Sequence, residues 1–108
     1  MKNRQAEVYV NAMRAGTLRQ EPGRYLFEYD ADYLAASHLP AVSLTMPKTQ
    51  RLYLAAKLFP FFVGLLAEGT NRSMQARALH LNESDDFSLL LATAHQQTIG
   101  AVTVRELL

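Results

Sequence analysis

A nearly unbroken hydrophobic run in the middle of the chain is the first feature of the pattern. Residues 58–67 are almost all apolar, and no charged residue lies between Lys57 and Glu68. Since a helix that packs on one side carries a polar stripe, a helix here needs cover on both flanks. The run is too short for a membrane span, which takes about 20 residues. We expect a helix from near Lys57 to a C-cap at Gly69, covered by its own domain or by a partner protein.

Alternating apolar and polar positions predict a β-rich first half. Gly16 suits a turn or bulge in a first hairpin, and Pro22-Gly23 suits a second reversal. The aromatic face of the strand that follows, 24–29, is expected to lie in the core. Residues 51–54 could be a short extension or a loop. The predicted strands are 7–11, 17–19, 24–29, 42–46 (the most clearly alternating) and 101–104, the last following Gly100.

Helical periodicity dominates the second half. One or two turns are expected within 30–37, before Pro40. A helix starting at Thr70 or Asn71 would bury one face formed by Met74, Ala78 and Leu81. A further helix opens with caps and acidic residues at 82–86, which suit a helix N-terminus, and would bury Phe87, Leu90, Leu91 and Ala94.

These elements predict an α+β domain spanning residues 1–108. We expect a small antiparallel sheet, or a partly closed barrel, packed with about three helices and completed by one closing strand. The 108 residues are 49% hydrophobic and 19% charged, which is typical of one globular domain. The start of the chain is polar and lacks an apolar signal core, so a cytoplasmic protein is expected.

The residue types offer no recognisable reaction. There is no cysteine, and His38, His80 and His95 lack the close spacing of metal ligands. The glycines form no phosphate loop, and Asp85 and Asp86 suit a helix cap better than acid–base catalysis. We expect no catalytic residue, no cofactor and no metal. The net charge of +1 gives no reason to expect direct nucleic-acid or membrane binding.

The order of several motifs resembles the N-terminal subdomain of HipA-type serine/threonine kinases, which are bacterial toxins. The resemblance covers roughly residues 6 to 104 and includes the leading strands. It departs at Ala67, where the family commonly has proline, and at Thr70, where it has a bulky residue. The segments that carry it are Val42–Pro47, Phe61-Phe62, Leu65–Gly69, Asp86-Phe87, Leu90-Leu91 and Ile99–Val102.

The resemblance implies an antitoxin. In the family the kinase core would lie beyond residue 108. Proteins of this kind look like the HipS-like antitoxins of three-component HipBST toxin–antitoxin systems. There, the small protein binds and inhibits a HipT-like kinase, and a HipB-like helix-turn-helix protein completes the complex.

The central apolar segment is the expected partner interface, because a domain that functions apart from its neighbour exposes apolar surface. In the competing interpretation, the sheet and the other helices cover the segment on every side, and Arg72 is an ordinary solvated residue. The expected interface residues are Phe61, Phe62, Leu65, Leu66, Glu68, Thr70 and Arg72.

Two other functions fit the same pattern. The chain could be a structural or activating lobe of a split HipA-like kinase. Less favoured is a small nucleic-acid-binding barrel with stacking aromatic residues on an open sheet face. Those residues would be Tyr9, Tyr25, Phe27 and Tyr29.

Overall fold

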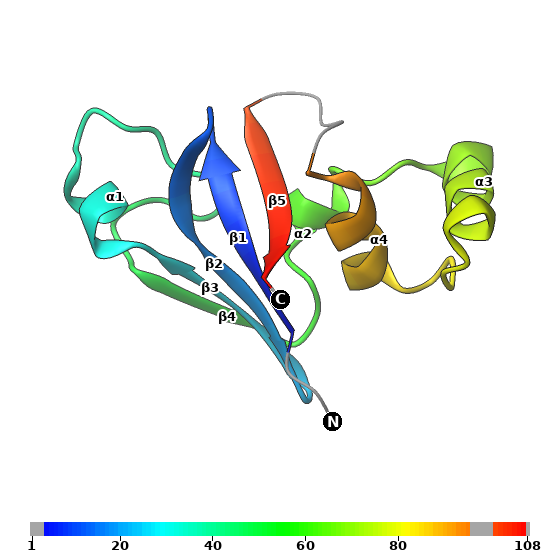
Figure 1. The fold of residues 1–108 in the computed structure, drawn as a ribbon. Coiled ribbons are helices and arrows are strands. Elements are labelled where there is room, and N and C mark those ends of the chain that lie inside the picture. Colours follow the sequence, from blue (N-terminus) through cyan, green and yellow to red (C-terminus); the bar gives the residue numbers. More distant parts are fainter. Residues whose placement is uncertain (1–3, 96–100, 108) are drawn as a thin grey trace.

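The computed structural model describes residues 4–95 and 101–107 and is built on a five-stranded antiparallel sheet (Figure 1). The strand order is β4-β3-β2-β1-β5, so the first and last strands of the chain are neighbours. Gly100, predicted just before the last strand, lies outside the described residues. The strands are β1 (Arg4–Val10), β2 (Met13–Glu21), β3 (Arg24–Tyr29), β4 (Leu52–Ala55) and β5 (Val102–Leu107).

The first hairpin turns at Asn11 and Ala12, whose positive φ angles of 50° and 68° are those that a tight two-residue loop requires. The register between β1 and β2 then shifts by one residue at a β-bulge. Gly16 lies beside this shift, where an added Cβ would stand 2.3 Å from the Glu28 carbonyl oxygen. Of the two positions predicted for Gly16, the bulge is therefore correct.

The second reversal at Pro22-Gly23 and the strand β3 are confirmed, since β3 spans residues 24–29 as predicted. Phe27 and Tyr29 are fully buried on the face predicted to be core. Leu26, on the opposite face, is also buried. It pairs with Leu54 of β4, whose side chain shares that face.

Helices cover one face of the sheet. Phe62 of α2 lies 6.1 Å from Phe27 between ring centroids, and Phe87 of α4 lies 5.8 Å from Tyr25. The last helix forms as predicted: its N-cap, Asp85, accepts a hydrogen bond from the Ser88 amide at 3.1 Å. The helices are α1 (Ala31–Ala35), α2 (Pro60–Val63), α3 (Gly69–Leu79) and α4 (Asp86–Thr93).

The prediction of a long central helix from near Lys57 to Gly69 is wrong. Only α2 forms there, and beyond Gly64 the backbone bonds change to the tighter i→i+3 type, from the Leu65 amide to Phe62 and from the Leu66 amide to Val63. Gly69, predicted as the C-cap of this helix, instead begins α3 with a φ of +57°. A single turn suffices because Phe62 is enclosed by aromatic rings on several sides.

The strand predicted over 42–46 is also wrong. The segment is a loop with one isolated bridge between Ser43 and Met46. The neighbouring strand, β4, forms instead at 52–55, so of the two alternatives for residues 51–54 the extended one is correct. Val42 and Met46 are buried, as a strand would have them, but Leu44 between them points into solvent.

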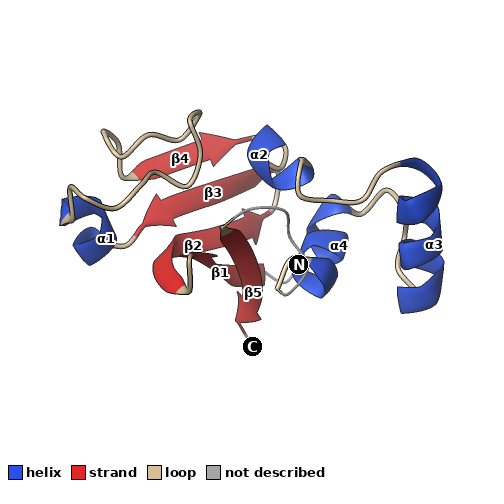
Figure 2. Cartoon of the chain, turned by 90° about the horizontal axis from the view of Figure 1, so that it is seen from above, coloured by secondary structure: helices blue, strands red, loops and turns tan. Residues whose placement is uncertain are grey.

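The helix predicted after Thr70 forms one residue earlier, but its expected buried face does not. Of its three residues, Met74 is 63% exposed and Ala78 is exposed, whereas Leu81 is half-buried and packs against the core. Within α3 only Ala76 is buried. Figures 1 and 2 show the reason: α3 is the helix farthest from the sheet, beyond α4. Only the C-terminal end of the predicted face, at Leu81, reaches the core.

The other face of the sheet carries cross-strand ion pairs, such as Arg19 with Glu28 and Arg14 with Glu7. At its β4 edge the same face exposes Leu52 and Leu54. Phe27 and Tyr29 are buried on the covered face, so they cannot serve as the base-stacking platform of a nucleic-acid-binding barrel. None of the helices in the described part of the chain has the length and hydrophobicity that crossing a membrane requires.

Candidate functional site

An apolar surface lies where loop 40–47 meets α2 and one end of the β1–β5 pair. It contains two adjoining hollows, with cavity volumes of about 310 Å³ and 500 Å³, that share part of the loop and Phe61. None of their lining residues is charged. The lining residues are Val10, Asn11, Pro40, Ala41, Val42, Ser43, Leu44, Phe61, Leu65, Ala101 and Val102.

The short helix α2 and the turn that follows it bring Phe61 and Leu65 to this surface. Phe62 packs inward and is fully buried, which turns its neighbour Phe61 outward to a half-buried position. The two rings contact edge to face at 5.3 Å. Of the two phenylalanines of α2, Phe62 therefore lies in the core and Phe61 in the wall of the hollows.

The hydroxyl of Tyr29 holds both arms of loop 40–47. It accepts a hydrogen bond from the Val42 amide at 2.9 Å and donates one to the Met46 carbonyl at 2.5 Å. These are backbone groups that a neighbouring strand would otherwise pair. The loop is therefore fixed without belonging to the sheet.

Two further tyrosines bind the ends of the same loop. Tyr33 donates to the Pro40 carbonyl at 2.6 Å, and Tyr53 donates to the Pro47 carbonyl at 2.5 Å. Tyr33 also stacks on Tyr29, with ring planes 6° apart. Loop 40–47 is thus held to the domain by three tyrosine hydroxyls and by the buried side chains of Val42 and Met46.

The tip of the loop is closed by bonds of its own. The Met46 amide donates to the Ser43 carbonyl at 3.0 Å, and the Ser43 and Thr45 hydroxyls lie 2.9 Å apart. Leu44 stands between them at the rim of the larger hollow, and its residue surface is 99% exposed. A hydrophobic side chain is held in water by a loop whose backbone is tightly fixed.

Burial raises the pKa of the Tyr29 hydroxyl, although the hydrogen bond from the Val42 amide opposes the shift. Burial also raises the pKa of Tyr33. Both hydroxyls therefore stay protonated at neutral pH, as they must in order to donate to the loop carbonyls.

The predicted interface residues fall into separate environments. Phe62 and Leu66 are in the core, whereas Phe61 and Leu65 line the hollows. Glu68 and Thr70 are exposed at the start of α3. The structure therefore brings together only two of the seven, Phe61 and Leu65, at the apolar surface.

Arg72, the seventh, is engaged within the chain. Its Nε donates to the Glu83 carbonyl at 2.9 Å, and its guanidinium also pairs with Asp86. Ser73 beside it bonds to the Glu83 carboxylate. We call these contacts among Arg72, Ser73, Glu83 and Asp86 the α3 clasp. Here Arg72 joins α3 to the start of α4, which is a structural role.

Leu44 and the rest of loop 40–47 are the part of this surface that the sequence pattern did not indicate. Pro40 and Pro47 bracket the segment, and proline cannot donate to a sheet ladder. The two prolines are the signal in the sequence for a loop rather than a strand in this segment.

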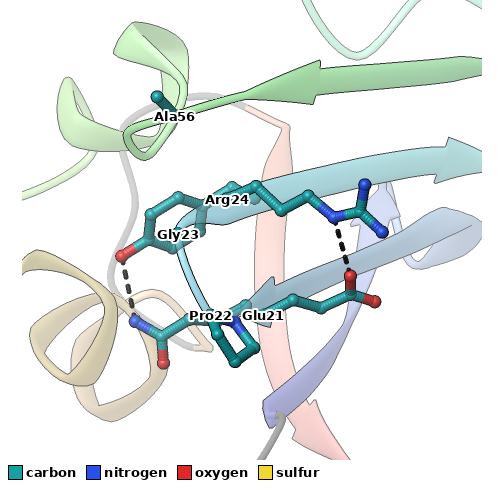
Figure 3. A pocket seen from close by; sticks show the side chains of 7 residues that line it. Glu21, Pro22, Gly23, Arg24 and Ala56 are labelled. Carbon is teal, nitrogen blue, oxygen red and sulfur yellow. Dashed lines mark hydrogen bonds and ion pairs between the residues drawn. The ribbon is translucent and has the colours of Figure 1, made fainter.

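A separate hollow of about 330 Å³ lies at the β2–β3 turn (Figure 3). Its polar side chains bond to each other: Gln20 donates to the Tyr25 hydroxyl, and Arg24 pairs with Glu21, each at 2.9 Å. This leaves the apolar surface at loop 40–47 as the better candidate. In the described ranges, no three His, Cys, Asp or Glu side chains are grouped so that they could hold a metal ion.

Comparison with known proteins identifies the family to which this fold belongs. The family model of the HipA N-terminal domain matches residues 6–105. An uncharacterized protein of Haemophilus influenzae is 31% identical over 103 residues, covering 95% of this chain and 92% of that protein. A solved structure of the N-terminal domain of HipA toxin matches with a TM-score of 0.75 and 28% identity, covering 97% of this chain and 93% of that one. The chain belongs to the HipA N-terminal domain family.

Proposed function

We propose that this chain is a non-catalytic antitoxin that binds and inhibits a HipT-like serine/threonine kinase toxin. A HipB-like helix-turn-helix protein would complete the complex in a three-component toxin–antitoxin system. Family membership supports a role related to toxin–antitoxin systems, and the inhibitory role and the two partners are our proposal.

The observation that carries the proposal is the share of each related protein's length that this domain covers. It accounts for 92% of the Haemophilus protein, whereas the solved relative is the N-terminal domain of a toxin. The same domain is thus found as one part of a toxin and as most of a small protein. A small protein of this kind could bind a toxin where the toxin's own N-terminal domain would otherwise lie.

The exposed apolar surface supports a protein partner. Leu44 and the hollows beside it form a patch whose lining carries no charge. Apolar patches of this type on soluble domains are typical of protein–protein contacts. The other face of the sheet carries paired arginines, and its exposed leucines, Leu52 at 38% and Leu54 at 56%, are less exposed than Leu44.

Phosphate transfer by a purified HipT-like kinase, with and without the chain, tests the proposal. We expect transfer of labelled phosphate from ATP to fall as the chain is titrated to a one-to-one ratio. A rise in transfer would favour the alternative, an activating lobe of a split kinase. No change, together with no complex in size-exclusion chromatography, would contradict both roles.

Assembly with a HipB-like protein is tested separately. Purification through a tag on this chain, after nuclease treatment, should recover both the kinase and the helix-turn-helix protein. Retention of both without nucleic acid would support a complex held by protein contacts. Recovery that depends on nucleic acid would contradict the expectation that this chain does not bind it directly.

A further inference from the structure

We propose that Leu44 is the anchor through which this chain binds the kinase, and that the Tyr29 hydroxyl positions it. This inference rests on the proposed function and names the surface that would perform it. Leu44 is 99% exposed, more than any other large hydrophobic residue among those described. Removing such a side chain from water on binding is strongly favourable.

The loop is ordered before any partner arrives. Tyr29, Tyr33 and Tyr53 together bond to backbone groups of the loop at Pro40, Val42, Met46 and Pro47. Binding through a loop that is already fixed avoids the entropic cost of ordering it, which improves affinity without adding a contact. Tyr29 is the most important of the three tyrosines because it alone forms hydrogen bonds to both arms of the loop.

The chemistry of the surface specifies what the kinase must present. The hollows have no charged lining residue, and the hydroxyls that flank Leu44 bond to each other. A charged group of a partner would be buried here without a counter-charge, which is costly. The matching surface is therefore an uncharged one: an apolar pocket for Leu44 and an apolar side chain for the hollow formed with Phe61.

The same argument disfavours a nucleic acid as the occupant of this surface. Phosphate groups are bound through lysine and arginine, and neither lines the hollows. Because Leu44 is itself part of the wall of the larger hollow, one protein surface can engage both features at once.

Dissociation constants of the full chain for a purified HipT-like kinase test this inference. We expect Leu44→Asp to weaken binding at least 100-fold. Leu44→Ala should weaken it about tenfold, because truncation to alanine loses only part of the free energy that burying a leucine side chain contributes. Leu44→Met should stay within about threefold. Leu54→Asp and Met74→Asp are the matched controls, because both positions are exposed and neither lines the hollows. They should bind within about twofold of wild type.

A double-mutant cycle separates positioning from general stability. Tyr29→Phe should weaken binding about five- to tenfold when Leu44 is present, but less than about twofold in the Leu44→Ala background. A loss of the same size in both backgrounds would mean that Tyr29 acts only on folding, which would overturn its positioning role.

The outcomes distinguish this inference from the proposed function. If wild type binds the kinase and Leu44→Asp binds equally well, the anchor is overturned and the proposed function stands. If wild type does not bind, the proposed function fails and takes the anchor with it. If light scattering instead shows a wild-type dimer that Leu44→Asp dissociates, a second copy occupies the surface and the kinase assignment is overturned.

Discussion

Loop 40–47 and helix α3 both lie outside the sheet, and the loop is attached to the domain by more contacts than the helix. The loop contributes two buried side chains and is held by three tyrosine hydroxyls. The helix contributes one buried side chain, Ala76, and depends on the α3 clasp. Regular backbone structure therefore does not indicate how firmly a segment is attached. Short helices owe most of their stability to packing, and α3 has little of it.

Removing the Tyr29 hydroxyl should have the largest effect on stability, because it detaches the better-anchored segment, loop 40–47. Tyr29→Phe leaves the buried Val42 amide and the Met46 carbonyl without their partner, so we expect a loss of about 1–3 kcal/mol in the free energy of unfolding. Urea denaturation followed by circular dichroism measures it. Tyr9→Phe, which removes a hydroxyl bonded only to the Glu7 carboxylate, is the control and should change stability far less. Equal losses in the two variants would mean that the loop is not held through Tyr29.

Alkaline pH should weaken the same attachment more gradually. The folded-state pKa of Tyr29 and that of Tyr33 are raised above 10.0 by burial. Their contribution to stability is therefore fully present below about pH 10 and is lost as pH rises through the folded pKa values, because the unfolded chain ionises first. Thermal unfolding between pH 8 and 11 checks this. Tyr29→Phe should show a shallower decline, and an unchanged slope would contradict the role of Tyr29.

The α3 clasp should affect one segment rather than the whole domain. Arg72→Leu removes the bond to the Glu83 carbonyl and the partly exposed pair with Asp86, which we expect to cost about 1 kcal/mol. Hydrogen exchange should accelerate in α3 while amides of β1–β3 keep their protection. Arg77→Leu, at an exposed position of the same helix, is the control. Faster exchange throughout the sheet would show that α3 and the core unfold together.

The smallest expected effect is at the end of α3. His80 occupies the C-cap position in the left-handed region, with a φ of 56°, where glycine is favoured. We expect His80→Gly to stabilise the helix by about 0.5–1 kcal/mol, seen as slower hydrogen exchange of α3 amides. His38→Gly, outside any helix, offers the comparison, and a destabilised α3 in His80→Gly would contradict the expectation.

The sequence pattern predicted the elements whose signals are local, whereas the strand β4 and the short length of α2 were not predicted outright, although both elements belong to the sheet or pack on it. The alternation of β3 and the Asp85 cap of α4 depend on local geometry, and both were correct. The loop could not be predicted in this way, because its backbone partners come from the hydroxyl of a residue in another element, Tyr29. Periodicity likewise cannot show whether a core lies beneath a helix, as Met74 illustrates.

The candidate site was partly accessible from sequence. The uninterrupted apolar run includes Phe61 and Leu65, which line the hollows. It could not separate them from Phe62 and Leu66, since which of four apolar neighbours turns outward depends on where the helix stops. The alternating pattern places Leu44 in a strand, so its exposure is evident only from the tertiary structure.

The pairing of β1 with β5 has a consequence during synthesis of the chain. One edge of β1 has its partner only when residues 102–107 have left the ribosome, roughly ninety residues later. At about 5–20 residues per second, that edge waits on the order of 5–20 s with its backbone groups unpaired. An unpaired edge can join another chain. We expect the nascent protein to be most prone to aggregation, and most dependent on chaperones, in this interval just before the last strand is translated.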